Sequence, residues 1–416
     1  MERKKFLSGF LCGMAFALCL GTLVVVGNRV GWFDWIYQTS TGSEKITNVE
    51  RRQTLQKLGL LERYIDRFYL NDLEADDYAD GLYKGLVSSL DDRYAAYYNK
   101  EEYSSINAAN EGKYVGIGCS VSFDKETGAF TIIKPYTDGP ADKAGICSGD
   151  ILVSIDGEPV AGKDLSEVVS IIKGEAGTEV SIEIQRGKSP KTMNMVVTRN
   201  EVETKTIIYT MLDHKIGYIG IAGFKENTVE QFEKAVDSLV KDGMVGLIMD
   251  VRNNGGGALT SVVAMSNRIL SDGLIVYTRD KYDKGQEYYA DDKQSLDVPM
   301  VLLVNGYSAS ASEVFAAALK DHGVATLVGT KTYGKGIVQS IFDLEDGSAI
   351  KLTTSKYFTP NGYNIHEKGI EPDIVVEQKV DDAEFDVESE EIPDPAKDNQ
   401  MKAAIDCMEG KLSGSR

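Results

Sequence analysis

The chain opens with a long apolar run behind a short basic segment. Three of the first five residues are bases, and the 22 residues 6–27 carry no charge. A membrane-spanning helix needs about 20 apolar residues, whereas the apolar core of a cleaved signal peptide has about 7–15. We therefore expect residues 1–30 to form a cytoplasmic stub and an N-terminal transmembrane helix. A cleaved signal peptide, with Ala15-Phe16-Ala17 resembling its cleavage site, is the alternative.

Both interpretations predict the same compartment. The basic residues before the run favour a cytoplasmic N-terminus, so the remainder of the chain lies outside the cytoplasm. With the anchor kept, the protein would be a single-pass protein of the cell membrane, with its folded part extracytoplasmic.

A linker and a helical region follow this run. Residues 31–48 are polar toward their end and are interpreted as the linker. Residues 49–110 carry apolar side chains at intervals of three and four, which is the spacing of one helix face. We predict one helix through the leucines between 55 and 68 and a second helix over Ala75–Leu90. The tyrosines between 94 and 103 are interpreted as packing residues.

Between residues 112 and 199 the predicted elements become short and mostly β-type. Two helices are predicted, a short one near Pro140–Ala144 and a longer one at Asp164–Lys173. Around them lie short β-type runs, namely Gly116–Phe123, Phe130–Pro135, Asp150–Ile155, Val180–Arg186 and Lys191–Arg199. This content indicates a small β-rich module inserted into the chain.

Residues 200–378 alternate apolar strands with amphipathic helices from residue 215 onward. The predicted strands are Ile216–Ile221, Val245–Val251, 274–278, 299–304 and 324–328, and the predicted helices are Thr228–Val240, 258–270 and 310–321. Such alternation predicts an α/β fold with a largely parallel sheet. A hairpin formed by Ile337–Leu344 and Ser348–Thr354 should close this part.

The end of the chain, residues 379–416, is strongly acidic. Nine acids and one lysine between residues 380 and 398 predict a solvated, mobile segment, and a short helix is predicted at 398–411.

The composition argues against several kinds of partner and active site. Asp and Glu number 64 against 45 Lys and Arg, a net charge of −19, which argues against nucleic acid as a partner. The three histidines make a His-rich zinc site implausible, and a hydrolase here would need another general base. Cys12 and Cys19 lie in the apolar run. Cys119, Cys147 and Cys407 are interpreted as free thiols, with a Cys119–Cys147 disulfide left open.

Three serines follow a predicted strand at the start of a predicted helix, in the segment Ser308-Ala-Ser310-Ala-Ser312-Glu313. Helix capping is one interpretation, because serine is a favoured N-cap residue. A nucleophile is the other, because N–H groups at a helix start stabilise an oxyanion. The candidate base is Lys335, set between two glycines, since burial lowers the pKa of a lysine amine. Gln339, four residues on, could orient that amine.

A glycine-rich turn supplies the third candidate element. The segment Asp250-Val-Arg252-Asn-Asn-Gly255-Gly256-Gly257 follows an apolar strand and precedes a helix. Its backbone N–H groups could face a reacting carbonyl, although a plain strand–helix turn explains the glycines equally well.

Together these segments resemble the carboxyl-terminal processing peptidases, also called tail-specific proteases. The resemblance rests on SASASE at 308–313, TYGKGIVQ at 332–339, DVRNNGGG at 250–257 and KGIEPDI at 368–374, and it covers residues 50–378. It implies a crotonase-like α/β protease core in which Ser310 is the nucleophile, Lys335 the base and Gln339 its orienting residue. The N–H groups of Gly256 and Ala311 would form the oxyanion hole. Gly255 stands where the family often has proline.

The module at 112–199 is similar to the family's PDZ domain. The resemblance makes Val115, Gly116, Ile117 and Gly118 the loop that binds a peptide carboxylate by its N–H groups. Val168, Ile171 and Ile172 either line the groove or pack inward.

The resemblance implies a membrane-anchored serine endopeptidase that cleaves proteins near flexible, apolar C-termini. Neither a cofactor nor a metal is expected, and a homodimer is a further expectation. A catalytically silent PDZ scaffold is the main alternative. A β-lactam hydrolase or an acyl-CoA enzyme is the third hypothesis.

Overall fold

The computed structural model describes residues 51–71, 75–124, 127–136, 138–187, 191–291, 295–379 and 392–414. The predicted transmembrane anchor, the linker and much of the acidic segment lie outside the described residues. Among the residues that are described, no helix is both long enough and apolar enough to cross a membrane. The chain forms two compact units, one up to Tyr78 and one from Ala79 onward.

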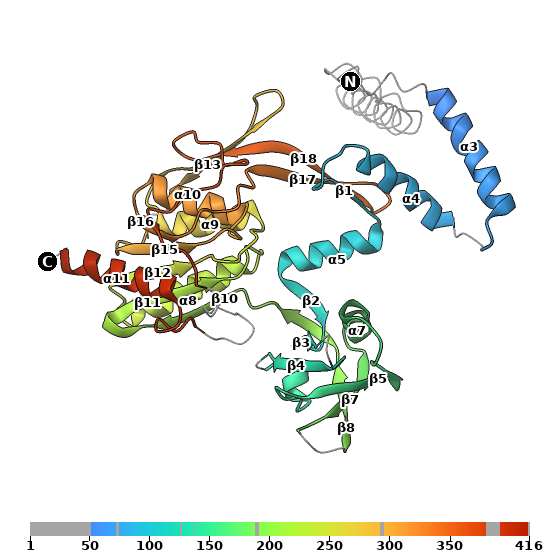
Figure 1. The fold of residues 1–416 in the computed structure, drawn as a ribbon, viewed down its shortest axis with the longest axis horizontal. Coiled ribbons are helices and arrows are strands. Elements are labelled where there is room, and N and C mark those ends of the chain that lie inside the picture. Colours follow the sequence, from blue (N-terminus) through green and yellow to red (C-terminus); the bar gives the residue numbers. More distant parts are fainter. Residues whose placement is uncertain are drawn as a thin grey trace, which may run out of the picture. The chain divides into compact units, whose positions relative to one another are not determined.

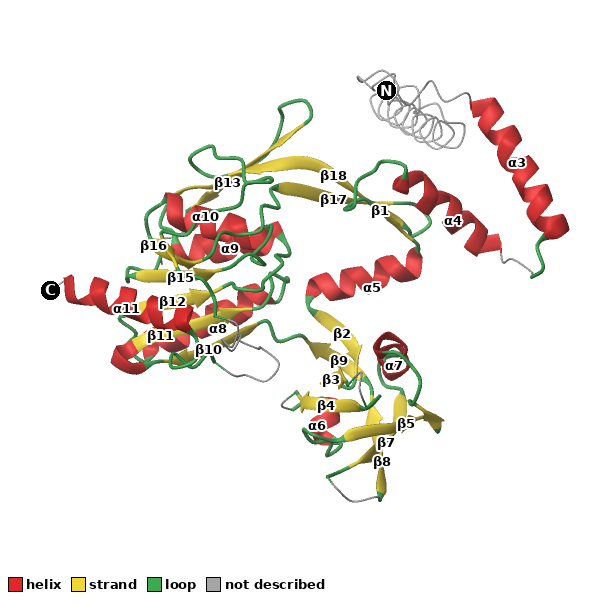
Figure 2. Ribbon diagram, in the orientation of Figure 1, coloured by secondary structure: helices red, strands yellow, loops and turns green. Residues whose placement is uncertain are grey.

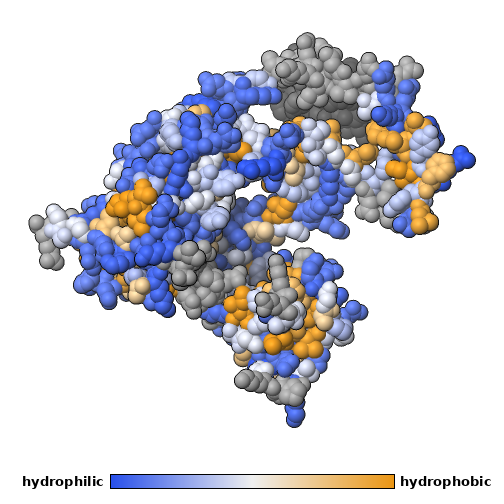
Figure 3. All heavy atoms as spheres, viewed as in Figure 1, coloured by the Kyte–Doolittle hydropathy of each residue, from blue (hydrophilic) through white to orange (hydrophobic). Residues whose placement is uncertain are grey.

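The first unit contains α3 (Arg51–Phe68) and the beginning of α4 (Ala75–Ser88). Both helices were predicted from the leucine spacing. The Tyr78 hydroxyl donates a hydrogen bond to Glu62 Oε1 at 2.5 Å. Helix α3 leaves several large apolar side chains exposed, including Leu55 and Phe68, and Figure 3 shows this apolar surface.

The second unit is built around a six-stranded sheet in the order β10-β11-β12-β15-β16-β19 (Figure 1). Only β10 is antiparallel to its neighbour, and the other five strands are parallel. The strands are Ile207–Met211, Ile216–Ile221, Gly246–Asp250, Met300–Val304, Ala325–Gly329 and Ile374–Val375. The predicted mixed α/β class is confirmed.

Helices cover both faces of this sheet (Figure 2). Leu247 and Met249 on β12 belong to one apolar core, with α8 (Thr228–Lys241), α9 (Leu259–Ile269) and α10 (Ala311–Asp321). The intervening Ile248 belongs to a second core, with α11 (Asn399–Gly414). The full burial of alternate residues on both sides explains why the strands are almost continuously apolar.

The second unit contains a second sheet, and one of its strands carries the candidate site residue Gln339. It has the order β1-β18-β13-β14, with β17 paired to β18. Its strands are Ala96–Tyr98, Ala349–Phe358, Gly273–Asp280, Glu287–Ala290 and Ile337–Asp343. The predicted hairpin is β17–β18, and a bulge interrupts its register between Val338 and Gln339.

The predicted β-rich module enters and leaves through one antiparallel strand pair. Strand β2 (Lys113–Gly116) pairs with β9 (Asn200–Glu203), which brings the two ends of the module together. Inside lies a six-stranded sheet of β3 (Cys119–Phe123), β4 (Phe130–Pro135), β5 (Ile151–Ile155), β6 (Glu158–Pro159), β7 (Glu179–Gln185) and β8 (Thr192–Thr198). The helices are α6 (Pro140–Lys143) and α7 (Leu165–Ile172). The module has its own apolar core.

Three expectations change. Among the described cysteines, Cys119, Cys147 and Cys407 form no disulfide, so the optional Cys119–Cys147 bridge is absent. Helix α5 (Lys100–Glu111) was not predicted as a separate element, because it buries no residue and so has no apolar period. Asp398, assigned to the solvated acidic segment, is fully buried because it pairs with Arg252.

Candidate active site

The structure separates the three serines at the start of α10. The Ser308 hydroxyl donates to the Val251 carbonyl at 2.8 Å, and the Ser312 hydroxyl donates to the Asn254 carbonyl at 2.8 Å. Both hydroxyls therefore fix the α10 turn to the glycine-rich loop, and both residues are fully buried. Ser310 alone retains some solvent exposure, at 9%.

Ser310 also has an unusual backbone. Its φ is 56° and its ψ is −114°, outside the regions that L-residues normally occupy. A conformation of this kind costs about 1–3 kcal/mol and is retained where the surroundings enforce it. It resembles the sharp strand-to-helix turn that exposes the nucleophile of other serine hydrolases. Ser310 is also the N-cap of α10 and forms a capping box with Glu313, so the structure agrees with both interpretations of this segment.

Glu313 connects this turn to the loop that carries Lys335. The side chain is fully buried and accepts hydrogen bonds from two backbone N–H groups of that loop, Gly334 at 2.7 Å and Lys335 at 2.8 Å. It accepts a third from the Thr332 hydroxyl at 2.6 Å and a fourth from the Ser310 N–H at 2.8 Å. One carboxylate thus fixes the backbones of both candidate catalytic residues. The sequence suggested only that Glu313 suits a first helical turn.

The amine of Lys335 is partly buried and lies over an aromatic ring. Its Nζ is 4.5 Å from the centre of the Tyr94 ring. Burial lowers the pKa of this amine, and the cations Lys351 and Arg93 lower it further, against the opposing effect of Asp92 and Glu313. A lowered pKa is what a lysine base requires. No hydrogen bond within the described part of the chain joins Lys335 Nζ to Ser310 Oγ.

Gln339 lies on β17, next to the bulge. Its amide nitrogen donates to the Thr353 hydroxyl at 3.5 Å, across the β17–β18 pair. The structure therefore places the predicted orienting residue on a strand adjoining the Lys335 loop, with its amide directed to β18.

The predicted oxyanion donors lie beside the serine. A methyl group on Gly256 would come within 2.9 Å of the Ala311 nitrogen and 3.0 Å of Ser310 Cβ, so the two backbones pack closely. With a φ of 104°, this position also requires glycine. Ala311 is the first residue of α10, so its N–H has no acceptor within the helix. The Gly256 N–H donates to Asn254 Oδ1 at 2.8 Å.

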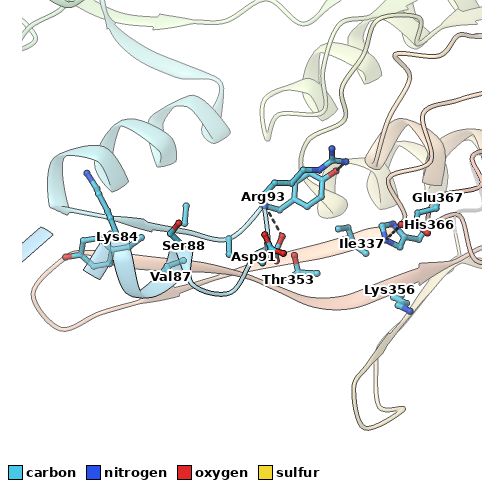
Figure 4. Close-up of a pocket in the computed structure, with 15 residues that line it drawn as sticks. Lys84, Val87, Ser88, Asp91, Arg93, Ile337, Thr353, Lys356, His366 and Glu367 are labelled. Carbon is cyan, nitrogen blue, oxygen red and sulfur yellow. Dashed lines mark hydrogen bonds and ion pairs between the residues drawn. The ribbon is translucent and has the colours of Figure 1, made fainter. Parts of the chain in front are cut away.

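A cleft of about 1140 Å³ is lined by Tyr94, whose ring contacts the Lys335 amine, but Ser310, Lys335 and Gly256 are not among its lining residues. Val87 on α4, Asp91 and Arg93 between α4 and β1, and Ile337 and Thr353 of the β17–β18 hairpin line this cleft (Figure 4). The cleft is large enough for an extended peptide segment, because binding pockets span about 300–1000 Å³. The tyrosine-rich segment, interpreted from sequence as packing, thus also lines the cleft.

Two of the histidines, His322 and His366, can be compared with Lys335 as possible bases for Ser310. His322 ends α10, at the opposite end from Ser310, and its Nε2 lies 2.8 Å from the Leu274 carbonyl. Eleven helical residues separate the two positions by about 16 Å, so His322 does not serve Ser310. His366 lines the cleft, and its Nε2 is 4.0 Å from Glu367 Oε1.

The predicted carboxylate-binding loop joins β2 to β3. Val115 and Gly116 end β2, and the Ile117 and Gly118 carbonyls accept hydrogen bonds from the N–H groups of Ala141 at 2.7 Å and Tyr136 at 2.9 Å. These bonds turn both carbonyls into the module. On α7, Val168 and Ile172 pack into the module core, and the partly exposed Ile171 packs against the edge of that core.

Comparison with known proteins agrees with this architecture. Residues 215–376 match Peptidase family S41, and residues 131–186 match the PDZ domain. The carboxy-terminal processing protease CtpB of Bacillus subtilis is 35% identical over 333 residues, covering 79% of this chain and 69% of that protein. CtpA of the same organism is 34% identical over 342 residues, covering 81% and 73%.

A solved structure agrees in fold. An S41 protease from Bacteroides fragilis superposes with a TM-score of 0.52 at 14% identity, covering 82% of this chain and 93% of that one. At this identity the likeness concerns the fold alone.

The fold and the matched regions define a serine-type peptidase with a PDZ domain. More specifically, the chain belongs to the carboxy-terminal processing proteases of peptidase family S41.

Proposed function

We propose that the protein is a membrane-anchored, extracytoplasmic endopeptidase that uses a Ser310–Lys335 dyad. The observation that carries the proposal is the Glu313 carboxylate, which holds the backbone N–H groups of Ser310 and Lys335 at 2.8 Å each. It couples nucleophile and base across the 22 residues between Glu313 and Lys335.

In the proposed reaction, Ser310 Oγ attacks the scissile carbonyl carbon while the neutral Lys335 amine accepts its proton. The oxyanion of the tetrahedral intermediate is stabilised by the N–H groups of Gly256 and Ala311. Collapse of the intermediate releases the C-terminal fragment, whose amine takes the proton from Lys335. Water, deprotonated by Lys335, then hydrolyses the acyl-enzyme and regenerates Ser310.

Productive catalysis requires two side chains to move. Lys335 Nζ, 4.5 Å from the centre of the Tyr94 ring, must turn toward Ser310, with Gln339 orienting it. Asn254 Oδ1 must release the Gly256 N–H, to which it is bonded at 2.8 Å. We infer that substrate binding supplies this rearrangement, because an oxyanion is a better acceptor for that N–H than a neutral amide.

The dyad is tested by Ser310→Ala in the full chain, with cleavage of an unfolded protein bearing an apolar C-terminus as the readout. Cleavage should be lost, whereas the matched control Ser238→Ala, on α8, should cleave normally. Lys335→Arg should also be inactive, because guanidinium does not lose its proton near neutral pH. Activity in Ser310→Ala would contradict the dyad, and an inactive wild-type protein would favour a silent scaffold.

We propose that the PDZ domain selects the substrate tail. The Val115–Gly118 loop would bind the terminal carboxylate through its N–H groups while the peptide adds a strand beside β3. Apolar C-terminal peptides should bind the wild-type protein, and the same peptides with an amidated C-terminus should bind much more weakly. Equal affinity for both would contradict carboxylate recognition.

Anchoring is proposed from the apolar run at residues 6–27. The full chain should remain in membranes washed with alkaline carbonate, with its folded part accessible to protease added outside the cell. Release of a shortened chain would favour the cleaved signal.

We also propose a homodimer through α3. Helix α11 presents its apolar residues Met401, Ala404 and Met408 to the sheet, whereas α3 exposes Leu55 at 67% and Phe68 at 68%. Leu55→Glu should convert a dimer to a monomer in sedimentation experiments, and an unchanged mass would contradict this contact.

A further inference from the structure

A buried charged cluster lies at the base of the glycine-rich loop. The Arg252 side chain is 3% exposed and lies between the carboxylates of Asp250 and Asp398, which are both fully buried. Arg252 Nη2 is 2.7 Å from Asp250 Oδ2 and 2.7 Å from Asp398 Oδ2. Asp250 and Arg252 belong to the DVRNNGGG segment, whereas Asp398 comes from the end of the chain.

Asp398 joins this cluster to α11. Its Oδ1 accepts hydrogen bonds from the first-turn N–H groups of Gln400 at 3.0 Å and Met401 at 2.9 Å, so the same carboxylate caps the helix. Gln400 adds a second acceptor, because its Oε1 receives a hydrogen bond from Arg252 Nη1 at 3.1 Å. The start of α11 therefore holds two separate nitrogens of one guanidinium.

The position of Arg252 fixes the segment beside Ser310. Asn254, two residues on, accepts through its carbonyl oxygen the Ala309 N–H at 3.0 Å and the Ser312 hydroxyl at 2.8 Å. Its side chain holds the Gly256 N–H at 2.8 Å. A short run of backbone thus connects the guanidinium to the proposed oxyanion donor.

The charges of Arg252, Asp250 and Asp398 determine what the loss of Asp398 would do to the loop. The cluster sets two carboxylates against one guanidinium, so removing Asp398 leaves a one-to-one Arg252–Asp250 pair and takes away one of the two carboxylates beside Arg252 Nη2. Without Asp398, the Arg252 guanidinium would keep Asp250 as its only carboxylate partner within the cluster and would turn toward it. The loop that begins at Arg252 would then lose its Asp398 contact at the start of α11, while the hydrogen bonds of Val251 and Asn254 to Ser308 and Ser312 would remain.

We propose that Asp398 is a positioning residue for catalysis, acting through Arg252 to hold the oxyanion loop. The proposal rests on the proposed role of Gly256 as an oxyanion donor. Asp398 touches neither substrate nor reacting atoms. Its loss should therefore weaken transition-state stabilisation and leave tail recognition by the PDZ domain unchanged, so kcat should fall while KM stays constant.

The test is Asp398→Asn in the full chain, with a fluorogenic peptide substrate that ends in apolar residues. We expect kcat to fall about 10–100-fold, less than the roughly 10²–10³-fold effect of losing an oxyanion donor outright. The inhibition constant of a peptide aldehyde should rise by a similar factor, because the oxygen of its adduct with Ser310 occupies the oxyanion hole. Asp398→Glu, which keeps the charge, should recover part of kcat.

A structural control comes from the same helix. Met408 is fully buried on the sheet side of α11 and does not belong to the charged cluster. Met408→Ala should lower the melting temperature while kcat stays near the wild-type value. An equal loss of kcat in Met408→Ala, or a wild-type kcat in Asp398→Asn, would overturn the proposal.

Two further variants cover a failure of Asp398→Asn to fold and a failure of the proposed dyad. If Asp398→Asn does not fold, Gln400→Leu removes one acceptor of Arg252 and leaves Asp398 in place. It should lower kcat by a smaller factor at constant KM, and an unchanged kcat would overturn the proposal. Ser310→Ala distinguishes the two levels of inference, since its activity would refute the dyad whatever the Asp398 variants do.

Discussion

Ser310 and Glu313 show how single residues can determine the geometry of this site. Ser310 holds a φ of 56°, which a free chain would rarely adopt. Glu313, three residues later, accepts its N–H and also those of Gly334 and Lys335. The strained turn is therefore maintained by a carboxylate that also accepts the Lys335 N–H, so a change at Glu313 acts on both proposed catalytic residues.

Glu313→Gln is expected to reduce both activity and stability. The amide keeps one acceptor oxygen but directs an NH₂ group at backbone donors, and a hydrogen bond to a charged group contributes about 1.5–3 kcal/mol. We expect a comparable fall in the free energy of unfolding and a loss of kcat of about 10²-fold, because small misplacements of reacting groups are costly. Denaturant unfolding and steady-state kinetics measure both. The exposed Glu345→Gln is the matched control, and normal kcat in Glu313→Gln would contradict the bridging role.

Lys351→Met should change the pH dependence of catalysis. Lys351 lowers the pKa of the Lys335 amine, so removing this cation should raise that pKa. The neutral amine would then form only at higher pH, and the acid limb of the kcat/KM profile should move to higher pH with a similar plateau. Lys331, which is paired with Glu371 at 2.8 Å, offers a control in Lys331→Met. A shift to lower pH, or no shift, would contradict the assignment of Lys335 as the base.

Among the helices and strands, the sequence predicted the ones whose apolar residues recur at the spacing of a helix or a strand. Strands β11, β12, β15 and β16, helices α8 to α10 and most of the β-rich module lie within a few residues of their expected positions, because burial dictates their pattern. Strands β10 and β19 were not predicted, and the strand expected at 274–278 is β13 of the second, antiparallel sheet. Helix α5 was not predicted either. It buries no side chain, and its signal is instead a capping box, in which Asn99 accepts the Glu102 N–H at 2.9 Å and Glu102 accepts the Asn99 N–H at 3.0 Å.

The sequence likewise predicted some residues of the candidate site and not others. Local motifs pointed to Ser310, Lys335 and Gly256, because each lies in a turn whose glycines or small residues are visible in sequence. The partners of these residues were not visible. Tyr94 contacts Lys335, and Asp398 pairs with Arg252, across long stretches of chain. Such pairings depend on tertiary packing, which a single sequence does not reveal.

Helix α7 provides a prediction about the PDZ domain. Asp164 accepts the Glu167 N–H at 2.9 Å, and Glu167 accepts the Asp164 N–H at 2.7 Å, which closes a capping box at the helix start. Asp164→Ala should destabilise the domain by about 1 kcal/mol and weaken binding of apolar C-terminal peptides, because α7 forms one side of the proposed groove. Asp164→Ser, which can still cap, should retain most of both. Unchanged peptide affinity in Asp164→Ala would exclude α7 from the groove.

For the whole molecule, the central point is that the PDZ domain is closed on itself. Its ends meet in the β2–β9 pair, where Lys113 is opposite Glu203 and Gly116 is opposite Asn200. Its apolar core contains residues only from Ile117 to Val197. The domain therefore has both the closed ends and the separate core of an independently folding unit.

Residues 112–203 should accordingly fold alone. We expect a single cooperative unfolding transition and binding of the same apolar peptides that the full chain binds. A shorter fragment of residues 117–199, which lacks the β2–β9 pair, should be less stable in denaturant titrations. A fragment 112–203 without cooperative unfolding would show that the domain depends on the peptidase core.

The contact between Arg252 and α11 has a consequence for biosynthesis. Arg252 and Gln400 lie 148 residues apart in sequence. A ribosome adding about 5–20 residues per second makes the loop roughly 7–30 s before the residues that hold it. During that interval Ser310 is translated while Arg252 lacks its contacts with Asp398 and Gln400. On the proposed role of Asp398, a nascent peptidase gains full activity only when α11 docks.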